Sequence, residues 1–204
     1  MHVVVNMAAS LDGRVAGPGG QPVQLSGEAD LRRVHALRAA SDAVVVGAGT
    51  VAVDDPRLTA RPDPRPPREA QPLRVVVTSQ PQLPAQARVL DDTADTLVLA
   101  GQPGQIAGAD VHAAPGEAGV DLAQAWEELA ERGVEDVMVE GGPTLVASLL
   151  AADLVDRFML YTAPRILGEG PSLAAAFEGL SLELEPRTRT ALGEGTLTTY
   201  GVPP

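Results

Sequence analysis

Residues 44–51 read VVVGAGTV, a short β-branched run that ends in glycine and threonine ahead of a helical pattern. Residues 137–146, VMVEGGPTLV, repeat this arrangement. An apolar run that passes through glycines into a helix is typical of the strand and helix units of α/β proteins. The two segments therefore predict an α/β fold with a mostly parallel central sheet and helices on both faces.

Similar stretches flank these two segments along the chain. We expect strands at residues 2–7, 43–46, 75–77, 96–99 and 137–139, with antiparallel closing strands at 158–161 and 196–200. Helices are expected after Ser26, which would cap a helix that buries Leu31, Val34 and Leu37, and also after residue 47, over 121–132, and up to Leu150. The proline-rich stretch 61–72 is expected to be a surface loop, and residues 1–204 to form one domain.

The composition narrows the function. Lys and Arg number 15 against 27 Asp and Glu, so the formal net charge is −12, which argues against nucleic-acid or membrane partners. The chain has no cysteine, and His2, His35 and His112 are too scattered to predict a metal site. There is no recognisable signal peptide and no apolar run near the roughly 18 residues of a membrane span, so a cytoplasmic protein is expected.

The two glycine-containing strand ends are candidate cofactor loops. Glycine lets a backbone approach a ligand closely, and the free N–H groups of a helix start bind phosphate. Neither loop has the Rossmann or Walker spacing. Each could equally be a tight turn between strand and helix.

Several polar residues lie next to these loops. Residues 54–61, DDPRLTAR, combine acids that could bind ribose hydroxyls with arginines that could bind phosphate, or they form a solvated turn. Asn6 lies in an apolar strand and Glu140 ends another, so each needs a polar partner or a ligand. Arg38 follows Leu37 and, from the helical pattern alone, is expected on the surface.

Taken in order, the segments NMAASLDGRVA (6–16), LSGEADLRRVHALRAASDAVVVGAGTVAVDDPRLTAR (25–61), LRVVVTS (73–79), VEGGPTL (139–145) and LVDRFMLYTAPRILGEG (154–170) cover most of the chain. Together they resemble the reductase domain of the riboflavin pathway, which has a dihydrofolate reductase-like fold. The resemblance implies hydride transfer from NADPH to C1′ of the ribose of a phosphorylated ribosylaminopyrimidine, in a homodimer. It implies cofactor contacts at Ala8, Gly47, Thr50, Asp54, Ser79, Gly141, Gly142 and Thr144, and substrate contacts at Asn6, Arg38, Leu58, Arg61 and Glu140, with the two arginines binding the phosphate.

The resemblance is greatest to the stand-alone archaeal and fungal type, which acts on the 2,5-diamino substrate. Asn6 stands where bacterial members usually carry Lys, and a chain without cysteine has no zinc-deaminase signature. Asp54, Glu140 and Asn6 are the candidate catalytic residues, and Glu140→Gln is expected to reduce turnover with little effect on the fold. The alternatives are reduction of the deaminated uracil, a pteridine reductase on the same fold, and a non-catalytic nucleotide sensor.

Overall fold

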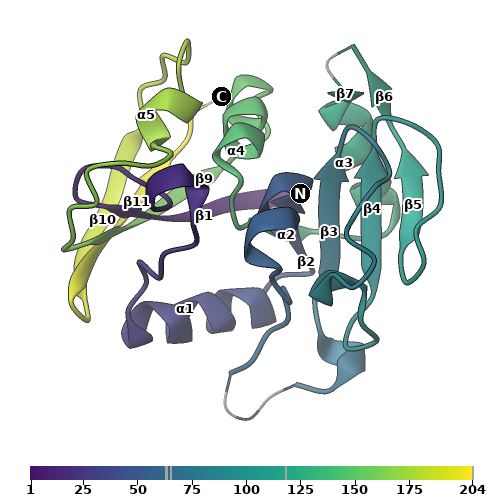
Figure 1. Ribbon diagram of the computed structural model, residues 1–204, viewed down its shortest axis with the longest axis horizontal. Coiled ribbons are helices and arrows are strands. Elements are labelled where there is room, and N and C mark those ends of the chain that lie inside the picture. The colour runs from purple at the N-terminus through teal and green to yellow at the C-terminus, as the bar shows by residue number, and fades with distance from the viewer. Residues whose placement is uncertain (63, 65, 118, 204) are drawn as a thin grey trace.

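A nine-stranded sheet forms the centre of the molecule (Figure 1). The computed structural model describes residues 1–62, 64, 66–117 and 119–203. The strand order is β10-β11-β9-β1-β8-β2-β3-β4-β5, and β6 and β7 form a separate small hairpin. The strands are β1 (His2–Ser10), β2 (Ala43–Gly47), β3 (Leu73–Thr78), β4 (Thr96–Ala100), β5 (Asp110–Ala113), β6 (Pro115–Gly116), β7 (Gly119–Val120), β8 (Asp136–Val139), β9 (Arg157–Ala163), β10 (Glu185–Leu192) and β11 (Gly195–Gly201).

The helices connect these strands. They are α1 (Glu28–Ala39), α2 (Ala48–Asp54), α3 (Leu122–Glu131), α4 (Pro143–Ala151) and α5 (Leu173–Ala176), with short 3₁₀ turns η1 (Pro18–Gly20), η2 (Arg68–Ala70) and η3 (Arg88–Leu90). No helix in the described part of the chain combines the length and apolar character needed to cross a bilayer.

The sheet is parallel from β9 through β5, and β11 and β10 close it in antiparallel fashion. The predicted mostly parallel sheet is therefore confirmed, and residues 196–200 lie in the antiparallel closing strand β11. Residues 158–161 differ in part from the prediction, because β9 pairs with β1 in parallel and is antiparallel only to β11. Parallel pairing buries the central strands on both faces, which explains their continuous valine runs. All four residues 43–46, for example, are fully buried.

Helices cover both faces of this sheet, as predicted. One face packs against α3, α4 and α5 through side chains such as Trp126 and Leu149. The other face packs against α1 and α2 through Val34 and Val51. In Figure 1, α2 lies in front of the sheet and α3 lies behind β3 and β4. The polar residues discussed below lie on the face that α1 and α2 cover.

Two details of the first helix differ from the sequence prediction. Ser26 does not cap α1: the N-cap residue is Gly27, and the Ser26 hydroxyl instead donates to Asp30 at 2.5 Å. Leu31 is 37% exposed, whereas Asp30 and Arg38 are buried beside Val34. The buried face of α1 is thus partly polar, because its charged side chains find ionic partners.

Four strands were not predicted from the sequence. The four-residue β5 and the exposed β10 lie at the two edges of the sheet, and the β6–β7 hairpin has only two residues a side. Edge strands need no continuous apolar run. In the predicted loop 61–72 the structure contains the turn η2, while residues 63 and 65 of that loop lie outside the described residues.

Candidate active site

The carboxyl ends of β1, β8 and β2 are adjacent because β8 inserts between the two earlier strands. In open α/β sheets, ligands bind beyond the carboxyl ends of the strands, at the point where the order of the strands reverses. The backbone N–H of Glu140 donates to Val45 O at 2.9 Å, which fixes the end of β8 against β2. The predicted site residues from these three strands therefore converge on one edge of the sheet.

Side-chain alternation puts the polar residues on a single face. Val3, Val5 and Met7 of β1 belong to the core under α3 and α4, so Asn6 and Ala8 point to the opposite face. The same alternation in β8 turns Glu140 toward the α1 side, since residues 137 and 139 pack in the α3–α4 core.

The two glycine loops meet at this edge. Gly142, the N-cap of α4, has φ 67°, and a Cβ added there would lie 3.3 Å from Thr50 Oγ1 and 3.8 Å from Gly47 N. Gly141 also has a positive φ, 102°. The backbone N–H groups in the first turn of α4, which begins with Pro143, have no intrahelical partner, and no side chain caps them, so they are available to an anion. This close approach requires glycine and leaves a cradle of backbone that suits phosphate.

Glu140 forms a buried ion pair with Arg38. Arg38 Nε donates to Oε1 and Nη2 donates to Oε2, both at 2.5 Å, and the two side chains are about one-tenth exposed. Arg38 Nη1 also donates to Thr59 O at 3.1 Å. The surface position expected for Arg38 from its helical pattern is therefore wrong, because the carboxylate at the end of β8 compensates its burial.

The loop after α2 is folded over this ion pair. Asp55 and Leu58 both adopt left-handed conformations, with φ 42° and 56°, although neither is glycine. Leu58 is fully buried, and Asp55 accepts a hydrogen bond from the backbone N–H of Arg88 at 2.7 Å. Such strain persists only where the surrounding contacts impose it, and it often marks functional loops.

Arg61 lies at the end of this loop beside α1. Its Nη1 donates to Thr59 Oγ1 at 3.1 Å, and its Nη2 lies 3.4 Å from His35 Nε2. Burial lowers the pKa of His35, and the charges of Arg61 and Arg38 lower it further. The two predicted phosphate-binding arginines thus lie close to one another, because both contact Thr59, and Arg61 lies beside His35.

Three further predicted cofactor contacts lie on the segments that directly follow β2, β3 and β8. Asp54 is the last residue of α2, and partial burial raises the pKa of its carboxyl above the ordinary value. Ser79 directly follows β3 and is exposed, and a Cβ on Gly119 would approach its Cβ to 3.1 Å. Thr144, in the first turn of α4, is also exposed.

Two residues that sequence reasoning missed complete the polar face of α1. Arg33 Nη2 donates to Asn6 Oδ1 at 2.7 Å, and Arg33 is itself held by the buried carboxylate of Asp30. Their signal in the sequence was helical spacing, since residues 30, 33 and 38 share a face with Val34 and Leu37.

Solved structures place this fold in a class. The chain is similar to the riboflavin biosynthesis reductase of Saccharomyces cerevisiae, with a TM-score of 0.79 at 21% identity, over 99% of this chain and 90% of that one. It is also similar to dihydrofolate reductase from Enterococcus faecalis, with a TM-score of 0.52 at 16% identity, over 100% and 97% of the two chains. The protein therefore has the dihydrofolate reductase-like α/β fold.

Sequence relatives identify the family. Residues 1–198 match the family model described as the RibD C-terminal domain, and the chain belongs to this family, as its resemblance predicted. Two relatives are named 2,5-diamino-6-ribosylamino-4(3H)-pyrimidinone 5′-phosphate reductase. That of Archaeoglobus fulgidus is 41% identical over 82% of each chain, and that of Methanothermobacter thermautotrophicus is 39% identical over 98% of each.

Proposed function

We propose that this protein is an NADPH-dependent reductase of riboflavin biosynthesis. Its substrate would be 2,5-diamino-6-ribosylamino-4(3H)-pyrimidinone 5′-phosphate, whose ribose is reduced to the open-chain ribityl form. The observation that carries the proposal is the convergence of Asn6, the Arg38–Glu140 pair and the two glycine loops at the carboxyl ends of the central strands. The archaeal relatives named for this activity match most of the chain. We further propose one domain over residues 1–204, a homodimer, and a cytoplasmic location.

The glycine loops fit a dinucleotide cofactor. A Cβ added at Gly142 would fill the space between this loop and Thr50 and Gly47, and such open backbone is the geometry that a close phosphate contact needs. Thr50 and Thr144 would donate to the same phosphates. Ala8, Asp54 and Ser79 would line the remainder of the cofactor site. When bound, NADPH supplies the hydride.

The substrate phosphate would be bound by Arg61 and Arg38. A guanidinium has five N–H groups, and three of those of Arg38 donate to Glu140 and Thr59, so two remain for a phosphate. Leu58, buried in its left-handed conformation, would lie beside this phosphate site.

The proton chemistry would fall to the acids. Both oxygens of Glu140 already accept hydrogen bonds from Arg38, which suits Glu140 to accept and orient ribose hydroxyls. Asp54 is the better candidate for the proton donor, because its raised pKa favours the protonated carboxyl and a bound cofactor would bury it further. Turnover that depends on protonated Asp54 must fall as the pH rises through its pKa, and Asp54→Asn should abolish this dependence.

An absorbance assay at the NADPH band tests the proposal. The diamino substrate and its deaminated uracil counterpart are offered separately, with NADH as the control cofactor. Oxidation with the diamino compound supports the proposal, and a preference for the uracil would reverse the order of reduction and deamination. Turnover of dihydrofolate alone would indicate a pteridine reductase, and NADPH binding without turnover of any substrate would indicate a sensor.

A further inference from the structure

We propose that Arg33, anchored by Asp30, orients the side-chain amide of Asn6 so that its Nδ2 group donates a hydrogen bond to an oxygen of the substrate. Arg33 is then a positioning residue for substrate recognition. The inference rests on the proposed function and deepens it.

The anchor is a buried carboxylate. Asp30 is 1% exposed, and one of its oxygens accepts from Arg33 Nε at 2.8 Å and from Nη2 at 2.6 Å. Its other oxygen accepts from the Ser26 hydroxyl at 2.5 Å. Because two N–H groups of the Arg33 guanidinium donate to the same Asp30 oxygen, the guanidinium has little rotational freedom. Its Nη2 group therefore points in a fixed direction.

This fixed direction determines how the Asn6 amide lies. Arginine can only donate hydrogen bonds, so the Asn6 atom at 2.7 Å from Arg33 Nη2 must be the carbonyl oxygen. Because the amide is planar, Nδ2 then points away from Arg33. Among the described residues Nδ2 has no acceptor, and it is not sealed from solvent.

Asn6 lies on the face that carries the candidate site, so a bound ligand can replace water as the acceptor of the Nδ2 group. Asn6 shares this face with Glu140, and α1 sends one arginine to each of them: Arg33 to β1 and Arg38 to β8. Arg33 Nη1 is buried and, within the described part of the chain, lacks a partner. A buried donor without a partner lowers stability, so an arginine needed only for folding would be poorly placed here.

The recognition is chemically selective. An amide N–H can donate to a pyrimidinone carbonyl, a ribose hydroxyl or a ring oxygen, but an amino substituent opposite it would place two donors face to face. The Asn6 position therefore selects an oxygen atom in the substrate.

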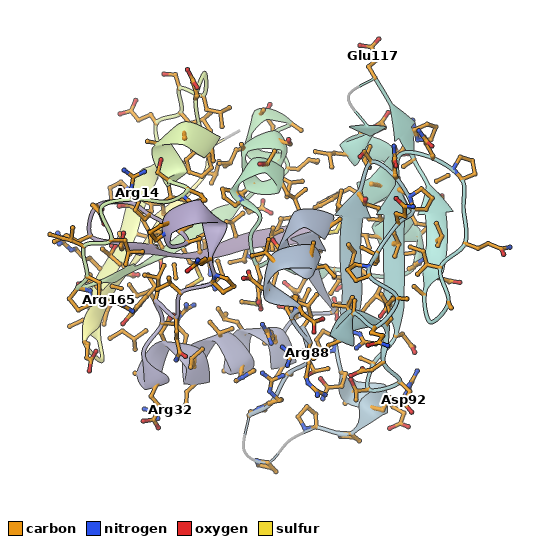
Figure 2. All side chains as sticks on the ribbon, viewed as in Figure 1. Arg14, Arg32, Arg88, Asp92, Glu117 and Arg165 are labelled. Carbon is orange, nitrogen blue, oxygen red and sulfur yellow. The ribbon has the colours of Figure 1, made fainter. Side chains whose placement is uncertain are left out.

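The test compares Arg33→Met, Arg33→Lys and Asn6→Asp in the NADPH-oxidation assay. Arg32→Met is the matched control: Arg32 is the adjacent arginine, pairs with Glu28, and points away from the sheet in Figure 2. Arg33→Met should raise the substrate KM on the order of tenfold, as expected for one misplaced hydrogen bond, with the NADPH Kd unchanged. Arg33→Lys, which can still donate to Asn6, should restore most of the affinity, and Arg32→Met should behave as wild type.

Asn6→Asp separates orientation from folding. It keeps an oxygen for Arg33, so it should unfold at the wild-type temperature or above, yet it removes the donor and should raise the substrate KM more than tenfold. If Arg33→Met fails to fold, Asn6→Asp still tests whether the Asn6 amide donates a hydrogen bond to the substrate. A wild-type KM in Asn6→Asp, or wild-type KM and kcat in folded Arg33→Met, would overturn the inference. An inactive wild-type enzyme would instead refute the proposed function, and this inference with it.

Discussion

Replacing Glu140 by glutamine should reduce both stability and turnover, a stronger effect than the sequence alone suggested. Glu140 and Arg38 are each about 90% buried and joined by two hydrogen bonds. A neutral amide leaves the Arg38 charge uncompensated and turns an NH₂ donor toward a guanidinium. Breaking a buried pair on one side costs about 3 kcal/mol or more, which for a chain of this size lowers Tm by roughly 6–12 °C.

The assay combines thermal unfolding with NADPH oxidation well below the Tm of the variant. We expect kcat to fall on the order of 100-fold, as for loss of a group that assists proton transfer or orients the sugar. Glu28→Gln is the matched control, because Glu28 pairs with Arg32 on the exposed side of the same helix. An exposed pair contributes about 0–1 kcal/mol, so this change should leave both Tm and kcat near wild type.

A double variant identifies the physical cause. Arg38→Met combined with Glu140→Gln removes the isolated charge, so it should recover most of the lost stability but none of the turnover. If Glu140→Gln unfolds at the wild-type temperature, the two groups do not act as a buried ion pair. A wild-type kcat in that variant would remove Glu140 from the mechanism.

Three further predictions test other parts of the structure. Gly142→Ala and Gly133→Ala both place alanine at a positive φ, and each should lower the free energy of unfolding by about 1–2 kcal/mol. Only Gly142→Ala should also weaken NADPH binding, measured by titration. Equal NADPH Kd values for the two variants would refute the phosphate-binding role of the Gly142 loop. Arg74→Met removes a fully buried guanidinium that donates to Arg88, Asp91 and Ala94, so it should lower the free energy of unfolding, measured in denaturant, by about 3 kcal/mol. A loss below about 0.5 kcal/mol would contradict this. The pKa of Asp12 is lowered to about 2, chiefly by the Ser10 hydroxyl, so its stabilisation is present above the ordinary value near 4 and is lost as the pH falls toward 2. Asp12→Asn should therefore be less stable at neutral pH and insensitive across that acid window; an unchanged acid profile of Tm would argue against this role.

The central strands could be predicted from sequence because their cause is local. A parallel strand buried on both faces must be apolar at every position, and runs such as 43–46 show this directly. The glycine loops were equally visible, since a tight strand-to-helix turn demands glycine at particular positions. The edge strands escaped prediction because β10 is exposed at nearly every residue and has no apolar pattern.

The candidate site was only half visible in the sequence. Asn6 and Glu140 stood out because a polar group in a buried strand needs a partner. The partners did not stand out, since a helical pattern that buries Val34 gives no reason to bury Asp30 and Arg38 as well. Only the position of α1 across β1 and β8 supplies the opposite charges and acceptors that make their burial tolerable.

The sequence by itself determined which segments become strands, where glycine permits close backbone approach, and which family the chain resembles. These properties follow from side-chain size, periodicity and backbone freedom, which act over a few residues. The tertiary structure alone decided that β8 lies between β1 and β2, and that α1 sends Arg33 to Asn6 and Arg38 to Glu140. Those pairings join residues 27 and 102 positions apart, and only the folded packing, in which each buried charge meets its partner, specifies them.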